Sequence, residues 1–259
     1  MGHVRLGALP KTREWRRVVE LLELGADTAE IAGAVAVAAE KDFAAAQSDP
    51  ALTEVIWLLT QLPLAARSNR FAAELTALGF PPGSENSLLE IIGGLSCAVE
   101  VQVGNAPGRT DLGELARHAA AESLSEIIGS QTPSLFGDSS EDARIELAKF
   151  ATKDRFAQLA RDFFARLTNK TLDYYVSRVL AEHVGPDRAY ETLHDKTRFQ
   201  RALALHCRET SEIVEQFAGG WYSKSNFQGT LTRESTKRFG SYALKKMRDE
   251  LRARRGNDA

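Results

Sequence analysis

The stretch Lys149–Leu180, KFATKDRFAQLARDFFARLTNKTLDYYVSRVL, decides the fold class of this 259-residue chain. Its large apolar residues recur three or four positions apart, so they fall on one side of a helix. They are Phe150, Phe156, Leu159, Phe163, Phe164, Leu167, Leu172, Tyr175, Val176 and Leu180. Ser139 with Asp142 is a helix start signal, and the spacing predicts helix from there to about His183 with few interruptions.

The rest of the chain repeats this helical pattern. Start signals of the form S/D-x-x-E pair Asp27 with Glu30, Ser87 with Glu90 and Asp111 with Glu114. Only Val99–Val103, where valines alternate with polar residues, competes as a short strand. Gly93-Gly94 inside a predicted helix indicates a close approach by another helix. The sequence therefore predicts an all-α fold, an irregular multi-helix bundle of about eight to ten helices.

A serine-, glycine- and proline-rich segment divides the chain near its middle. It is Gly129–Ser140, GSQTPSLFGDSS, and such composition is typical of a domain boundary. We therefore expect two lobes. Residues 1–130 would form an N-terminal helical lobe with a basic N-terminal arm. Residues 138–259 would form a C-terminal helical lobe with an aromatic loop and a basic terminal helix.

The composition favours a cytoplasmic protein with no membrane association. No run approaches the roughly 18 apolar residues of a membrane span, and MGHVRLGALPKTREW lacks the apolar region of a secretory signal. Leu6 stands where a myristoylation motif needs Ser or Thr. Cys97 and Cys207 are too few and too far apart for a disulfide-stapled scaffold, and both have apolar neighbours, so we interpret both as buried free thiols.

Basic residues outnumber acidic ones at both ends of the chain, and acidic residues outnumber basic ones between them. The whole chain has 33 basic and 35 acidic residues. The first seventeen residues have a net charge of +4, and Arg233–Ala259 has a net charge of +5, so the segment between them has a net charge of −11. Blocks of one sign often mark surfaces that meet phosphate or an oppositely charged partner.

No motif that works by local spacing is present. The sequence lacks G-x-G-x-x-G, G-x-x-x-x-G-K, H-E-x-x-H, G-x-S-x-G and C-x-x-C. We therefore predict no catalytic residue, no metal site and no cofactor. A catalytic group assembled in space would escape this search, so an enzyme remains the third possibility.

Two groups of residues that include histidine have either a chemical role or an ordinary structural one. His183, His194, His206 and Cys207 are residue types that bind zinc, although adjacent residues on a helix point about 100 degrees apart. Glu114, His118 and Glu122 share a helix face, as in a proton shuttle. Surface pairing and burial in the core are far commoner for such residues, so we favour those roles here.

The first candidate binding site is a predicted loop, Gly219–Leu231, rich in aromatic residues. Its candidate partner-binding residues are Trp221, Tyr222, Lys224, Asn226 and Phe227. Exposed aromatics beside a lysine can anchor an interface or stack on bases. Alternatively, Trp221 and Phe227 pin the loop to the core, and Gly219-Gly220 merely ends a helix.

The second candidate is a basic terminal helix that begins near Thr232. Leu244, Met247 and Leu251, with Phe239, Gly240 and Ala243, form its apolar stripe. The candidate residues for binding nucleic acid or an acidic partner are Lys237, Arg238, Lys245, Arg248, Arg252, Arg254 and Arg255. Such a helix can lie in a partner's groove or meet a phosphate backbone. It can equally pack on its own domain.

Two stretches carry a family resemblance. The run from AGGWYSKSNF (218–227) through ALKKMRDEL (243–251), together with VRLGALPKTREW (4–15), resembles helical accessory proteins of bacterial antiphage-defence gene clusters. The resemblance implies a non-enzymatic partner of an ATPase or nuclease. It assigns no role to any residue.

These features together favour a non-enzymatic helical adaptor or accessory subunit of a bacterial multi-protein assembly, with a protein partner. The alternative is a nucleic-acid-binding protein that uses its basic termini. A pI near 6.3 counts against that alternative, because dedicated nucleic-acid binders are usually basic across the domain.

Overall fold

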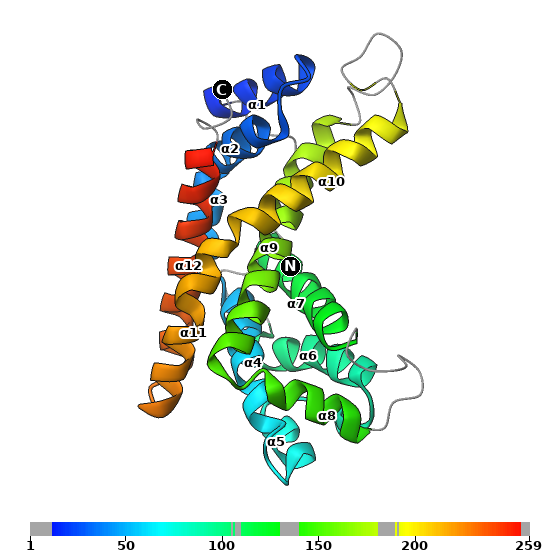
Figure 1. The fold of residues 1–259 in the computed structure, drawn as a ribbon, viewed down its shortest axis with the longest axis vertical. Helices are drawn as coiled ribbons and strands as arrows, with labels where there is room; N and C mark the ends of the chain where they lie inside the picture. The colour runs from blue at the N-terminus through cyan, green and yellow to red at the C-terminus, as the bar shows by residue number, and fades with distance from the viewer. Residues whose placement is uncertain are drawn as a thin grey trace.

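The computed structural model describes residues 12–104, 106, 110–129, 140–180, 190 and 192–254 (Figure 1). Within these ranges it contains twelve α-helices, one 3₁₀ helix (Ser84–Asn86) and no β-strand. The α-helices are α1 (Arg13–Glu23), α2 (Thr28–Ala38), α3 (Glu40–Ala46), α4 (Pro50–Ala65), α5 (Phe71–Ala77), α6 (Leu88–Val103), α7 (Asp111–Gly129), α8 (Ser140–Lys149), α9 (Lys153–Leu180), α10 (Leu193–Thr210), α11 (Glu212–Phe227) and α12 (Arg233–Arg254). The predicted all-α bundle is confirmed, with more and shorter helices than expected.

Helix α9 is the central element of the bundle. Helices α7, α10 and α11 all pack against it (Figure 1). The helical segment predicted to run with few interruptions has a turn at residues 150–152, which separates α8 from α9. Phe150 in that turn is buried, as are Phe156, Phe163 and Phe164 on α9. The apolar periodicity therefore predicted the burial of these residues correctly, but it did not locate the turn.

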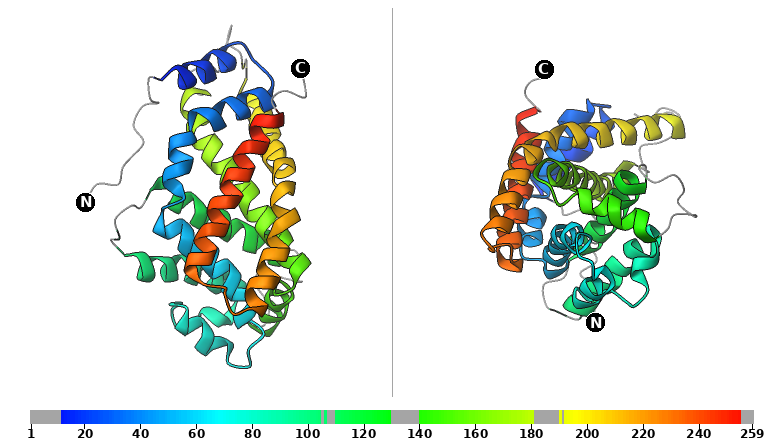
Figure 2. Two further views of the ribbon diagram at one scale, coloured as in Figure 1. Left: turned by 90° about the vertical axis from the view of Figure 1, so that its left-hand side faces the viewer. Right: turned by 60° about the horizontal axis from the view of Figure 1, so that its bottom comes forward.

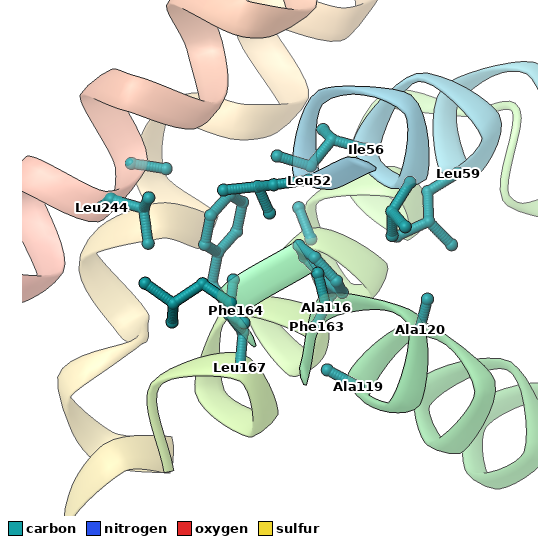
Figure 3. Packing of buried hydrophobic residues seen from close by; sticks show 14 of the residues in the cluster. Leu52, Ile56, Leu59, Ala116, Ala119, Ala120, Phe163, Phe164, Leu167 and Leu244 are labelled. Carbon is teal, nitrogen blue, oxygen red and sulfur yellow. The ribbon is translucent and has the colours of Figure 1, made fainter. Parts of the chain in front are cut away.

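Helices α4, α7, α9 and α12 meet in the core. Figure 3 shows Leu52 and Ile56 of α4, the small alanines of α7, Phe163 and Phe164 of α9, and Leu244 of α12. The predicted apolar stripe of the terminal helix is buried along its whole length. One hydrophobic cluster contains residues from both sides of the predicted lobe boundary. The linker at 130–139 lies outside the described residues.

A buried carboxylate joins the starts of α4 and α7. Asp49 caps α4 by accepting hydrogen bonds from the backbone N–H groups of Ala51 (2.7 Å) and Leu52 (3.0 Å). Its second oxygen accepts from the Thr110 backbone N–H at 2.5 Å and from the Thr110 hydroxyl at 2.8 Å. Gly113 permits this approach, because a Cβ there would lie 2.7 Å from Asp49 Oδ1.

Helix α6 contains both the candidate strand and the glycine pair for which a close helix approach was predicted. Val99–Val103, the candidate strand, is helical, so the strand alternative is wrong. A Cβ on Gly94 would lie 2.6 Å from Ser84 Oγ, whereas one on Gly93 would meet nothing within 4 Å. The close approach inferred for the glycine pair therefore holds for Gly94 alone.

Helices α11 and α12 run side by side along one edge of the bundle, at the left of Figure 1 and facing the viewer in the left view of Figure 2. A turn at residues 228–232 connects them. None of the described helices combines the length and the apolar character needed to cross a membrane. Residues 1–11 of the basic N-terminal segment lie outside the described part of the chain, whereas its Arg13, Arg16 and Arg17 lie on α1.

Candidate functional site

The segment predicted as an aromatic loop is mostly helix. Helix α11 continues to Phe227, which leaves only residues 228–231 of the predicted loop outside it. The loop prediction is therefore wrong for most of its length. The glycines suggested a break, but Gly219 instead lets α11 touch α9: a Cβ there would lie 2.6 Å from the Lys153 carbonyl oxygen. Tertiary packing outweighs the low helix propensity of glycine here.

Tyr222 belongs to the core and not to a contact surface. Its ring stacks on Phe156 with centroids 3.9 Å apart, and its hydroxyl donates to the Thr60 carbonyl oxygen at 3.3 Å. Burial raises the pKa of this phenol well above its ordinary value. The prediction that Tyr222 contacts a partner is therefore wrong, because the side chain is buried.

An open groove of about 810 Å³ lies between α11 and α12. It is lined by aromatic residues from both helices and by small polar residues near the connecting turn. The lining residues are Phe217, Trp221, Gly229, Thr230, Thr232, Ser235, Arg238, Phe239 and Tyr242. Among the residues that the structure describes, Arg238 is the one charged residue of this lining. A concave apolar surface with a few polar groups is the usual form of a binding site.

Ring contacts fix the walls of the groove. Trp221 stacks on Phe239, with centroids 4.0 Å apart and planes 12° apart. Phe217 meets Tyr242 edge to face at 4.9 Å. The Lys246 ammonium lies 5.6 Å from the centroid of the Tyr242 ring, in cation–π range. Side chains already held by their neighbours lose little conformational entropy when a ligand binds.

The sequence identified only part of this groove. Trp221 was predicted as a contact and Phe239 as part of a packing stripe, whereas Phe217 and Tyr242 were missed. Their signal was the spacing of four between Phe217 and Trp221, and between Arg238 and Tyr242. That spacing becomes informative only once the two helices are known to be adjacent.

Three other predicted contact residues lie outside the groove lining. Lys224 and Asn226 are exposed on α11. Phe227, at the end of α11, is 92% exposed, which excludes the alternative that it pins this segment to the core. The structure therefore separates these residues from Trp221, which forms part of the groove wall.

The cations of α12 divide into two groups. Arg248 and Arg252 both pair with Glu40 of α3, at 3.1 and 3.0 Å. Arg254 pairs with Glu250 at 3.1 Å and Glu209 at 3.5 Å. Lys237, Arg238 and Lys245 are exposed, and Arg255 lies outside the described residues. Three of the seven predicted cations thus form ion pairs with acidic residues of the same chain.

The histidine and cysteine cluster does not form a metal site in the described residues. No group of three or more His, Cys, Asp or Glu side chains is arranged there to hold a metal ion. His183 falls outside the described residues, whereas His194 and His206 lie on α10. Cys207 is buried, and burial raises its pKa to about 12, so it remains a neutral thiol at physiological pH.

The candidate proton shuttle on α7 is a set of surface ion pairs. Glu114 lies 3.3 Å from His118 Nε2 and also binds Arg117. Glu122 instead pairs with Lys170 of α9 at 2.6 Å. Both carboxylates therefore form ion pairs with basic side chains on exposed helix faces. This is the surface pairing that the sequence favoured.

Comparisons of this chain with protein-family models, with curated proteins and with solved structures find no match.

Proposed function

We propose that this protein is a non-enzymatic adaptor or accessory subunit that holds a protein partner in the groove between α11 and α12. The observation that carries the proposal is the groove itself, with aromatic walls from both helices and an open volume of about 810 Å³. Aromatic residues in a concave site are the side chains that most often dominate the affinity of protein interfaces.

The location of the basic residues supports a protein partner over nucleic acid. Arg248, Arg252 and Arg254 are engaged with acidic residues of the same chain. A phosphate backbone would have to compete for them and approach a chain whose middle segment is strongly acidic. The family resemblance supports a bacterial defence assembly with an ATPase or nuclease as the setting of such an adaptor, and the composition favours the cytoplasm as its location.

Site-specific photo-crosslinking tests the proposal. A benzophenone-bearing phenylalanine replaces Tyr242 in one variant and Ile145 of α8 in a second, and each is irradiated in native cells. These two side chains are matched, because they are 47% and 45% exposed. A discrete protein adduct at position 242 that is absent at position 145 is the expected result. A nucleic-acid adduct at 242, or the same adducts at both positions, would contradict the docking role.

A further inference from the structure

We propose that the occupant of the groove is an acidic protein segment with an aromatic or aliphatic anchor residue. This inference rests on the proposed function and specifies the partner's chemistry. It depends on which charges face the groove and on whether they are already neutralised.

Basic side chains flank the aromatic walls on α12. Arg238 lines the groove and its side chain is 75% exposed. Lys246 lies over the ring of Tyr242 at 5.6 Å. Since residues 238, 242 and 246 are successively four apart, they follow one face of the helix. A cation therefore stands on each side of an exposed aromatic ring.

The acidic residues nearby leave these cations available. Glu234 pairs with Arg238 at 3.3 Å, but both side chains are largely exposed, so a partner's carboxylate can replace it at little cost. Glu54 is bound to Arg233 and Asp249 to Arg248. Among the residues that the structure describes, Lys237, Lys245 and Lys246 form no ion pair. Lys246, which lies over the ring of Tyr242, therefore adds positive charge beside the groove that no ion pair among the described residues neutralises.

The spacing predicts a pattern in the partner. Residues 238 and 246 are separated by about 12 Å along α12, at 1.5 Å per residue. Two carboxylates that reach both cations therefore stand about eight positions apart on a partner helix, or about four apart on an extended strand. The anchor lies between them and enters the groove beside Tyr242, Phe217 and Trp221.

Selection from a random peptide library tests this pattern. Peptides long enough for four helical turns are displayed on phage, selected on the full-length protein, and re-measured singly by fluorescence anisotropy. We expect enrichment of peptides with a large apolar residue flanked by Asp or Glu. Tyr242→Ala should weaken their binding about 30-fold or more, and Arg238→Glu about tenfold or more.

Matched variants distinguish the groove from general surface effects. Ile145→Ala controls for loss of a half-exposed apolar side chain. Arg198→Glu on α10 controls for charge reversal, because Arg198 is also 75% exposed and pairs with a carboxylate, Asp195, one turn away at 3.2 Å. Both control variants should bind the selected peptides within about twofold of the unmodified protein.

The remaining outcomes separate the two proposals. Peptides that require Tyr242 but lack acidic residues, and that tolerate Arg238→Glu, would overturn the charge assignment and retain the docking groove. Failure to obtain any peptide that requires Tyr242 would overturn both proposals. Salt-sensitive binding of labelled single-stranded DNA or RNA that is lost in Arg238→Glu, without such peptides, would assign the groove to nucleic acid.

Discussion

Arg233, at the start of α12, forms a two-point ion pair with Glu54 of α4, which lies 179 residues earlier in the chain. Its Nε and Nη2 donate to the two carboxylate oxygens at 2.6 and 2.8 Å. The Glu54 side chain is 5% exposed and that of Arg233 is 47% exposed. The hydrogen bond to Glu54 raises the pKa of Arg233. This pair joins the turn beside the groove to a buried position on α4.

Arg233→Ala should lower the free energy of unfolding by about 1–3 kcal/mol, since it leaves a buried carboxylate without its partner. Urea denaturation followed by circular dichroism measures the change. Glu54→Leu with Arg233→Met should recover part of the loss, because neither an unpaired charge nor a cavity remains. If the single variant is as stable as the unmodified protein, the pair has no structural role.

Asp49→Ala should destabilise the protein more than removal of an ordinary helix cap. Asp49 is buried and accepts four hydrogen bonds at the starts of α4 and α7, so we expect a loss of about 2–4 kcal/mol. Asp27→Ala is the matched control, because Asp27 is an exposed cap of α2 with one such bond, from Ala29 N–H at 2.8 Å. Its loss should be about 1 kcal/mol. Equal losses in thermal or urea unfolding would contradict the bridging role of Asp49.

The sequence predicted the features that depend on local periodicity. The apolar spacing on α9 and α12 identified helices and the residues that they bury, because a helix brings positions three and four apart to one face. Ser87, a predicted start signal, caps α6 in the structure: its hydroxyl accepts a hydrogen bond from the Glu90 backbone N–H at 3.2 Å.

The sequence could not predict features that depend on distant neighbours. Gly219-Gly220 suggested a loop, whereas Lys153 of another helix accounts for Gly219 in the middle of α11. Nothing near Arg233 indicates that Glu54 neutralises it, or near Arg248 that Glu40 does. The groove could not be predicted for the same reason, since Tyr242 of α12 forms one of its walls only together with Phe217 of α11.

The two cysteines should differ sharply in thiol reactivity. Cys97 is exposed on α6, so the prediction that both thiols are buried is wrong for this residue, whereas Cys207 is buried as predicted. Burial raises the pKa of Cys207 to about 12. Near pH 8, a chromogenic disulfide reagent should modify one thiol per native chain quickly and the second only on unfolding. In Cys97→Ser the fast phase should disappear. Two fast thiols in the native protein would contradict the burial of Cys207.

The raised pKa of Cys207 also gives a pH dependence of stability. The thiol stays neutral in the folded chain up to about pH 12, whereas in the unfolded chain it ionises near its ordinary pKa of about 8.5. The contribution of this thiol to the free energy of unfolding is therefore complete below about pH 8.5. It is lost progressively as the pH rises towards the folded-state pKa. Cys207→Ala should show a smaller decrease in the free energy of unfolding between pH 8 and 10 than the unmodified protein. The same slope in both proteins would contradict this assignment.

Neighbouring glycines in α11 should respond oppositely to alanine. A Cβ on Gly220 would meet nothing within 4 Å, so Gly220→Ala should stabilise the protein by about 0.5–1 kcal/mol through helix propensity. A Cβ on Gly219 would lie 2.6 Å from the Lys153 carbonyl oxygen, a backbone atom that cannot move without shifting α9. Gly219→Ala should therefore destabilise it by about 1–3 kcal/mol. Urea midpoints of the two variants measure both effects, and because the substitutions are identical in chemistry and adjacent in sequence, each controls for the other. Stabilisation by both would mean that α11 does not pack against α9 at Gly219.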